Sequence, residues 1–396
     1  MTQVTAALVG IGGYGEYYAG QLLQATPERN VRLVAGIDAF PERSASRLAF
    51  QQAGTPIFSD LESFYRQASA DLVILAAPIH LHAPLTCLAL AHGSNVLCEK
   101  PLCATLEQAQ QMAAAERQAG KFVAVGYQWS FCDAVQALKR DVQAGVLGRP
   151  RLLKTLTLWP RRRSYYQRNT WAGRIHTDDG QPALDSPVNN ATAHYLHNML
   201  YILGDGRESS AGVKRVEAEV WRANPIENYD TAALRVTTES GAELLQFTTH
   251  AVAENIGPLA SYHFEEAVVE YGADQVFTAR FHNGTVKQYG NPEDSADNKL
   301  WQAVEAVRSG EKLACGIQAA LPHLECVNRI QETARIANFP REMVHTEGDE
   351  DPLNWVEGLA EAFQRGYAEG RLPVELPGLQ EWRQRCLAGG EEEKRV

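Results

Sequence analysis

Short apolar runs alternate with amphipathic stretches through the first third of the chain. The apolar runs are typical of buried strands. They cover residues 4–10, 31–37, 70–78, 94–99 and 121–127. The stretches with helical periodicity cover residues 14–25, 82–92 and 105–119. Strands that alternate with helices of this length indicate an α/β domain with a doubly wound parallel sheet.

The periodicity changes in the second part of the chain. Runs that read as strands, three of them alternating with period two, cover residues 151–160, 213–223, 229–238 and 241–251. Amphipathic helices are predicted at residues 297–309 and 316–338. We therefore expect an α/β domain at 1–128, an α+β domain at 129–349, and a C-terminal helical segment at 350–396 that ends in a frayed, charged tail.

The composition excludes some classes of protein. The 396-residue chain is 45% hydrophobic and 21% charged, which is ordinary for a globular protein. A formal net charge of -11 argues against nucleic acid or an anionic membrane as a partner. No apolar run approaches the roughly 18 residues of a membrane helix. Because the first predicted strand begins at Val4, we expect no cleavable leader. We expect a cytoplasmic protein.

The seven cysteines carry no pairing pattern. Their number is odd and no pair has CxxC spacing, so neither a disulfide framework nor a zinc site is indicated. We expect reduced, mostly buried thiols and no metal.

A glycine motif directly follows the first strand. In "GIGGYG", Gly10, Gly12 and Gly15 have the spacing that lets a tight turn and a helix N-terminus cradle a pyrophosphate. The second strand ends at Asp38, 23 residues after Gly15, where a carboxylate can accept hydrogen bonds from a ribose and repel a 2'-phosphate. These positions predict a Rossmann domain that binds NAD, while Arg43 leaves NADP open.

The segment "LCEKP" at 97–101 narrows the class further. Placed after the glycine motif and the "PIHLH" segment at 78–82, it closely resembles the Gfo/Idh/MocA oxidoreductases. The resemblance implies hydride transfer between a nicotinamide and a secondary alcohol of a sugar, sugar derivative or cyclitol. Lys100 matches the family lysine that hydrogen-bonds the reacting hydroxyl, and Pro101 matches a proline that commonly follows a cis peptide bond.

The resemblance also implies a cofactor site and an assembly. The expected cofactor contacts are Gly10, Ile11, Gly12, Gly15, Asp38, Pro78, His82, Glu99, Lys100 and Gln128. The second domain should contain a large, open, mainly antiparallel sheet. In the family the outer face of that sheet often forms the oligomer interface, so a homodimer or homotetramer is expected.

The stretch "NNATAHYLHNML" at 189–200 departs from the family pattern. Relatives carry D-x-G-x-H-x-x-D, and here the histidine falls on His194 while Asn190, Thr192 and His197 replace the other three positions. An imidazole titrates near neutral pH and suits acid/base work, whereas an amide can only orient a substrate. We expect His194 to be the acid/base group beside Lys100 and Asn190 to position the substrate. Alternatively, both histidines are core or interface residues.

A loop rich in arginine and aromatic residues precedes this stretch. Aromatic faces suit a sugar ring, and an arginine fork pairs with a carboxylate, phosphate or sulfonate. The loop therefore favours an anionic or glycosidic carbohydrate, or equally a subunit-contact arm. The loop contributes Arg161, Arg162, Arg163, Tyr165, Tyr166, Arg168, Trp171 and Arg174. The expected substrate contacts are Asn190, His197, Tyr166, Trp171, Gln128 and Arg168.

Three functions fit these residues. The first is an NAD-dependent dehydrogenase. The second is a redox-neutral glycosidase or lyase that oxidises, eliminates and returns the hydride, with His197 or Tyr166 as the extra acid/base group. The third is a nucleotide-dependent sensor without catalysis, which the intact Glu99-Lys100-Pro101 segment disfavours. The sequence names neither the substrate nor the direction of the reaction.

Overall fold

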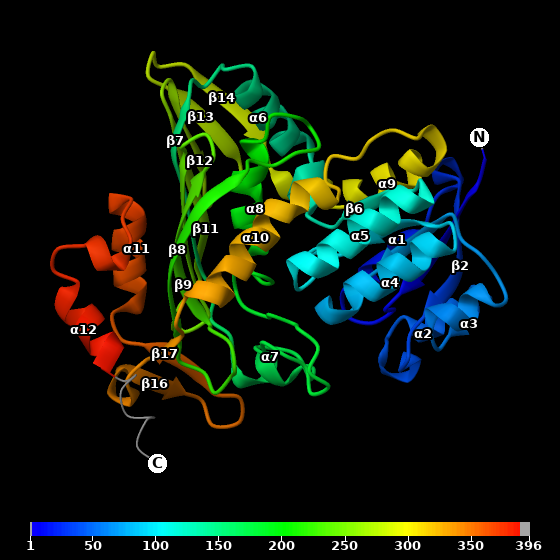
Figure 1. The fold of residues 1–396 in the computed structure, drawn as a ribbon, viewed down its shortest axis with the longest axis horizontal. Coiled ribbons are helices and arrows are strands. Elements are labelled where there is room, and N and C mark those ends of the chain that lie inside the picture. Colours follow the sequence, from blue (N-terminus) through cyan, green and yellow to red (C-terminus); the bar gives the residue numbers. More distant parts are fainter. Residues whose placement is uncertain (1, 389–396) are drawn as a thin grey trace. The chain divides into compact units, whose positions relative to one another are not determined.

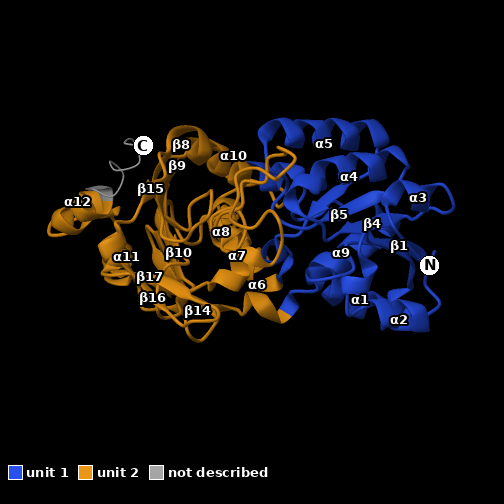
Figure 2. Ribbon diagram, turned by 90° about the horizontal axis from the view of Figure 1, so that it is seen from below, with its two compact units in different colours: residues 1–132, 295–321 blue, residues 133–294, 322–396 orange. Residues whose placement is uncertain are grey.

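The computed structural model describes residues 2–388, and these form two compact units (Figure 2). Unit 1 contains residues 1–132 and 295–321, and unit 2 contains residues 133–294 and 322–396. The expected segments did not include the return of residues 295–321 to unit 1. The tail at 389–396, expected to be frayed, lies outside the described residues.

Unit 1 is built on a six-stranded parallel sheet. The strand order is β3-β2-β1-β4-β5-β6, and every described pairing is parallel. The strands are β1 (Val4–Val9), β2 (Val31–Ile37), β3 (Ile57–Phe58), β4 (Leu72–Leu75), β5 (Asn95–Cys98) and β6 (Val123–Val125). The order reverses between β1 and β4, and such a switch point opens a ligand crevice at the carboxyl ends of the strands. The predicted doubly wound sheet is confirmed.

Helices cover both faces of this sheet (Figure 2). One face carries α1 (Tyr14–Leu23) and α9 (Asn298–Ser309), and the other carries α4 (Ile79–Ala91) and α5 (Leu106–Ala119). Two short helices, α2 (Arg47–Gln52) and α3 (Leu61–Tyr65), were not predicted. Because α9 contacts β1, β4 and β5, its packing explains why a segment so late in the chain belongs to unit 1.

Unit 2 is built on a nine-stranded sheet, ordered β14-β13-β12-β11-β7-β10-β9-β8-β15. Its strands are β7 (Pro150–Leu158), β8 (Val213–Arg222), β9 (Thr231–Thr238), β10 (Glu243–Thr249), β11 (Ile256–Phe264), β12 (Ala267–Tyr271), β13 (Phe277–Phe281), β14 (Val286–Gly290) and β15 (Ala337–Asn338). Only the β7/β10 and β8/β15 pairs are parallel among the described pairings. The expected large, mainly antiparallel sheet is confirmed.

Helices α6 (Asp133–Gln143) and α8 (Ala193–Ile202) pack on one side of this sheet. Helix α10 spans Ile317–Thr333, so the helix predicted at 316–338 was too long. Its expected last residues instead form β15 on the edge of the sheet, where Phe339 stacks on Trp221 with ring centroids 5.9 Å apart. Tertiary packing here outweighs local helical periodicity.

The C-terminal segment covers the opposite face of the sheet (Figure 1). It contains the hairpin β16 (Val344–Glu347) and β17 (Leu353–Val356), then α11 (Leu359–Glu369) and α12 (Gln380–Ala388). The expected C-terminal helical segment therefore also contains a strand. Leu359 and Phe363 share one helix face and pack on Leu245 and Phe247 of β10 in a single buried cluster.

The packing of the C-terminal helices on the sheet affects the surface that is left for the expected oligomer interface. The cluster under α11 and α12 includes buried side chains of β7, β8, β9 and β10. The face that the resemblance assigns to subunit contacts is therefore occupied over these strands by the chain itself.

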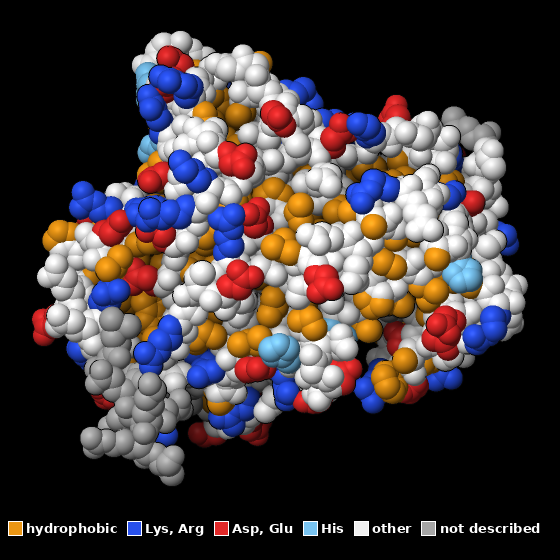
Figure 3. Space-filling model, viewed as in Figure 1, with side chains coloured by type: hydrophobic (Ala, Val, Ile, Leu, Met, Phe, Trp, Pro, Cys, Tyr) orange, Lys and Arg blue, Asp and Glu red, His pale blue; other side chains and the backbone are white. Residues whose placement is uncertain are grey.

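The surface agrees with the composition. Acidic and basic side chains are interspersed on the face shown in Figure 3. None of the described helices is long and apolar enough to cross a membrane. All seven cysteines are free thiols and all but Cys87 are buried, as expected.

Candidate active site

The glycine loop connects β1 to α1. A Cβ on Gly10 would lie 2.4 Å from the carbonyl oxygen of Ala76, and a Cβ on Gly15 would lie 1.8 Å from that of Gly10. Packing within unit 1 therefore requires both glycines. Gly12 differs, because its Cβ would meet only Ser44, at an ordinary 3.6 Å. Nothing described in the protein requires Gly12, which fits a position kept bare for a pyrophosphate.

Asp38 is held against this loop. Its Oδ2 accepts the N–H of Ile11 at 3.0 Å, and its Oδ1 accepts the N–H of Phe40 at 2.8 Å. A carboxylate offers about four acceptor positions, so Asp38 can still accept ribose hydroxyls. Arg43, whose side chain is 75% exposed, lies over the Phe40 ring at 4.4 Å and beside Glu42. These residues fit the adenosine side of an NAD site.

Helix α4 begins behind the end of β4, with Pro78 at its N-cap. His82 is buried one turn later. Its Nδ1 lies 2.7 Å from the carbonyl oxygen of Pro101 and its Nε2 lies 2.9 Å from that of Ala77. Burial lowers the pKa of His82. These contacts tie the ends of β4 and β5 together, so the described role of His82 is structural, and its contact with a cofactor stays a prediction.

Glu99 lies at the end of β5 in a buried polar cluster. Its Oε1 accepts the hydroxyl hydrogen of Tyr18 at 2.5 Å and pairs with the ammonium of Lys299, while its Oε2 accepts the N–H of Lys100 at 3.1 Å. Burial raises the pKa of Glu99, but Lys299 and Tyr18 outweigh it, so the pKa lies below its usual value. Gly126 leaves room for this carboxylate, because its Cβ would fall 2.7 Å from Oε1.

Sequence reasoning missed Lys299. Its side chain is completely buried, on α9, and its Nζ also donates to the Tyr14 hydroxyl at 3.0 Å. Burial lowers the pKa of Lys299, but Glu99 and Tyr14 outweigh that effect and raise it. The Tyr14 hydroxyl in turn lies 3.5 Å from Oε1 of Gln128. A polar line thus runs from Glu99 to Gln128, one of the predicted contacts.

Lys100 follows Glu99 and is half-buried. The Lys100–Pro101 peptide bond is cis, as the resemblance implied. Unit 1 therefore brings together the expected residues at the carboxyl ends of β1, β2, β4 and β5.

In unit 2, Asn190 lies in the turn before α8 rather than on the helix. Its N–H donates to the carbonyl of Ser186 at 2.9 Å. Its side-chain Nδ2 donates to Oδ1 of Asp185 at 2.8 Å. Asp185 is 3% exposed, and its Oδ2 accepts the N–H of Gly173 at 2.7 Å. The carboxylate absent from position 190 is thus one hydrogen bond away, on a residue that sequence reasoning passed over.

The two histidines of α8 differ in their surroundings. His194 is half-buried in the first turn of the helix. His197 is 1% exposed and stacks on Tyr201 with centroids 5.7 Å apart. Burial, with the neighbouring His323 and His194, lowers the pKa of His197 well below its usual value. His197 is therefore neutral in the protein interior, and its expected substrate contact has no support from its described surroundings.

Arg168, in the arginine-rich loop, lies close to both Asp185 and Trp171. The Arg168 guanidinium is 3.8 Å from the Tyr165 ring centroid, 5.5 Å from that of Trp171, and its Nη2 is 3.9 Å from Oδ2 of Asp185. Arg168, Asp185 and Asn190 thus form a continuous polar cluster.

Tyr166 lines a different space, a cavity of about 620 Å³. Its hydroxyl is buried and has no hydrogen-bond partner among the described residues. The cavity is also lined by Arg163, Arg174, Asn224 and Asn354. Arg168, Asp185 and Asn190, which form the polar cluster above, do not line this cavity.

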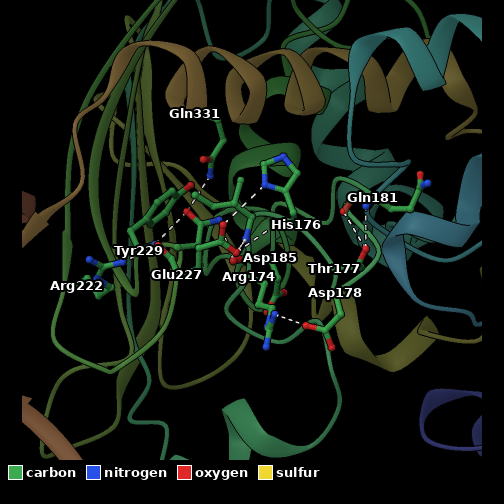
Figure 4. A network of polar contacts seen from close by, with 12 residues as sticks. Arg174, His176, Thr177, Asp178, Gln181, Asp185, Arg222, Glu227, Tyr229 and Gln331 are labelled. Carbon is green, nitrogen blue, oxygen red and sulfur yellow. Dashed lines mark hydrogen bonds and ion pairs between the residues drawn. The ribbon is translucent and has the colours of Figure 1, made fainter.

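Polar contacts fix the loop in place (Figure 4). Glu227 accepts the N–H groups of Ile175 and His176 at 3.0 and 3.3 Å. Arg222 donates from Nη1 to the carbonyls of Ile226 and Glu227 at 2.8 and 2.7 Å. The connection between β8 and β9 therefore anchors a segment that has little secondary structure of its own. Within residues 2–388, no cluster of side chains could hold a metal ion.

The sheet order, the glycine loop and Asp38 together define a dinucleotide-binding domain of the dehydrogenase type. Residues 4–127 match the family model of the Gfo/Idh/MocA proteins, described as an oxidoreductase family with an NAD-binding Rossmann fold. The resemblance noted in the sequence is thereby confirmed over these residues.

Individual relatives match shorter stretches. An inositol 2-dehydrogenase from Rubrobacter xylanophilus is 31% identical over 153 residues, which are 38% of this chain and 43% of the relative. A 2,7-anhydro-N-acetylneuraminate hydratase from Mediterraneibacter gnavus is 28% identical over 149 residues, 38% of each chain. The chain spans about half the length of the curated relatives it matches.

A solved structure matches almost the whole fold. The WlbA dehydrogenase from Bordetella pertussis, in complex with NADH and UDP-GlcNAcA, superimposes with a TM-score of 0.70. It covers 84% of this chain and 97% of the dehydrogenase at 22% identity, which shows a shared fold.

Proposed function

We propose that this protein is an NAD-dependent oxidoreductase that transfers a hydride between the nicotinamide and a secondary alcohol of a sugar, sugar derivative or cyclitol. The observation that carries the proposal is the glycine loop of unit 1. No contact among the described residues requires a glycine at position 12, and Asp38 is hydrogen-bonded to the same loop through the N–H of Ile11. The residues that would hold the cofactor are Gly10, Ile11, Gly12, Gly15, Asp38, Pro78, Glu99 and Gln128. When bound, NAD supplies the hydride acceptor or donor.

NAD is favoured over NADP by the described charges. The Asp38 carboxylate is fixed by two backbone N–H groups and cannot turn away from a ribose. A 2'-phosphate there would meet a negative charge, and Arg43 is stacked on Phe40 rather than paired with Asp38.

Lys100 would donate a hydrogen bond to the reacting hydroxyl. The Lys299–Glu99 pair supports this role, because Lys299 neutralises the carboxylate next to Lys100 and holds the end of β5 in place. His194 would take the hydroxyl proton during oxidation and return it during reduction, since an imidazole can do both near neutral pH. Asn190 would orient the substrate, with its own amide directed by Asp185.

Two relatives bear on the reaction type. The inositol 2-dehydrogenase supports net oxidation of a ring alcohol. The hydratase favours the redox-neutral route as the second candidate. Both routes need the same nucleotide and the same Lys100, so they are separated by their products rather than by the fold.

The test is a panel of sugars, cyclitols, uronates and glycosides with purified protein and NAD, followed at 340 nm. We expect NADH formation that is lost in Lys100→Ala and His194→Ala and kept in Lys121→Ala, which removes an exposed lysine of the same unit. Aglycone or water elimination without net NADH would establish the redox-neutral route. Tight NAD binding with neither activity would establish a sensor and refute the proposal.

A further inference from the structure

Two arginines of the loop hold their guanidinium groups against the same ring. The Cζ of Arg161 lies 5.1 Å from the Tyr165 centroid, and that of Arg168 lies 3.8 Å from it. Each has a second aromatic neighbour, since Arg161 is 5.6 Å from the Trp159 ring and Arg168 is 5.5 Å from the Trp171 ring. Contact with a ring orients a guanidinium without using its N–H donors. Each guanidinium also donates from Nη1 to a backbone carbonyl, Arg161 to Pro160 at 3.2 Å and Arg168 to Tyr165. Because a guanidinium carries five N–H groups, both arginines are fixed in direction and keep further donors for a ligand.

The charge around this pair is not balanced. Among the described residues, Asp185 is the one carboxylate within 4.0 Å of either guanidinium, at 3.9 Å from Arg168. Its oxygens also accept from Gly173 and Asn190. The nearby His250 is buried, and burial together with Arg161 lowers its pKa to about 3, so it is neutral at physiological pH. Two positive charges thus face one negative charge.

We infer that Arg161 and Arg168 bind a carboxylate of the substrate, and that the substrate is a sugar acid rather than a neutral sugar. The inference rests on the proposed dehydrogenase function and names its substrate class. A planar guanidinium matches a carboxylate with paired N–H donors. A carboxylate carries the single negative charge that the cluster lacks, whereas a phosphate carries up to two.

The cluster is also continuous with the candidate reaction site of unit 2. Arg168 approaches Asp185, Asp185 accepts from Asn190, and Asn190 lies four residues before His194. A carboxylate bound at the arginines would therefore lie at one end of a polar row that ends at Asn190, just before the helix that carries the proposed acid/base histidine.

The test compares charged and neutral versions of the same sugar. NADH formation is measured with D-glucuronate, D-galacturonate, D-glucose, D-galactose and glucose 6-phosphate, for the wild type and the Arg161→Met, Arg168→Met and Arg151→Met variants. Arg151 is a matched control, because it is an exposed arginine of unit 2 paired with Glu265, away from the loop. We expect the wild type to prefer a uronate, and kcat/KM for it to fall about 10- to 100-fold in either loop variant, mainly through KM. Arg151→Met should leave it unchanged.

A binding measurement separates this inference from the proposed reaction. Calorimetric titration of the NAD-loaded protein with glucuronate should show binding that Arg161→Met weakens by a similar factor, whether or not turnover occurs. Absence of turnover with uronate binding intact would refute the dehydrogenase and keep the anion subsite. A preference for neutral sugars or for the phosphate, or an equal loss of uronate and glucose activity in Arg161→Met, would overturn the sugar-acid assignment.

Discussion

Replacement of Lys299 by methionine should destabilise unit 1 strongly. The variant keeps the length of the side chain but removes the ammonium that pairs with Glu99, whose side chain is only 10% exposed. A buried carboxylate without its partner costs about 3–5 kcal/mol in the free energy of unfolding. For a domain of this size, that loss corresponds to a decrease in the melting temperature of roughly 6–20 °C.

The double variant Glu99→Gln/Lys299→Met isolates the charge. A neutral amide can still accept from Tyr18, so we expect stability within about 1–2 kcal/mol of the wild type. Lys287→Met, which removes an exposed lysine paired with Asp141, should cost less than about 1 kcal/mol. Urea unfolding at pH 7, followed by circular dichroism, measures all three variants.

The pH dependence has a defined sign. The folded-state pKa of Glu99 is lowered, so its contribution to stability is present above its unfolded pKa and is lost as the pH falls through the folded value. The pKa of Lys299 is raised, so its contribution is lost only as the pH rises through that alkaline value. The deficit of Lys299→Met should therefore shrink in acid, where protonation removes the buried charge. A single variant as stable as the wild type at pH 7, or a double variant as unstable as the single one, would refute this reasoning.

Three further predictions test the site and the packing of unit 2. Gly12→Ala should weaken NAD binding at least about 10-fold, as measured by fluorescence titration, without changing the melting temperature. Gly15→Ala should instead lower the melting temperature in thermal unfolding, because its Cβ would meet a carbonyl oxygen at 1.8 Å. Asp185→Asn should lower kcat/KM in steady-state kinetics about 10-fold or more. The double variant Asp185→Asn/Asn190→Asp should recover most of this loss, because the amide and the carboxylate exchange places in the same 2.8 Å hydrogen bond. A double variant as impaired as Asp185→Asn alone would contradict this prediction. Phe363→Ala should lower the free energy of unfolding by about 3–5 kcal/mol, because this fully buried ring fills the cluster under α11. A loss below about 1 kcal/mol in urea unfolding would show that α11 does not cover the sheet as described.

The sequence was sufficient for features that depend on neighbours in the chain. The glycine loop, Asp38 and the five longer strands of unit 1 were predicted within a few residues, because turn geometry and hydrophobic periodicity are local signals. The two-residue strands β3 and β15 are too short to carry a period, and only pairing with a neighbouring strand defines them.

Partners distant in the chain could not be predicted. Lys299 pairs with Glu99, which lies 200 residues earlier in the chain. A lysine in an amphipathic helix is expected to be solvent-exposed, and only the tertiary fold shows that this one is buried. His197 is the converse case, because its chemistry suggested a substrate contact or a core role, and only the fold shows that its side chain is 1% exposed. Asp185 is close to Asn190 in the sequence, but their contact depends on the turn before α8.

The most direct test of the central claim is the fate of the hydrogen on the reacting carbon. The best substrate of the panel, labelled with deuterium at its ring carbons, is incubated with protein and NAD, and the nucleotide is then analysed by mass spectrometry. Our account predicts NADH that carries one deuterium in its nicotinamide ring, and no transfer with Lys100→Ala. Nucleotide free of deuterium with every sugar of the panel would contradict hydride transfer by this protein.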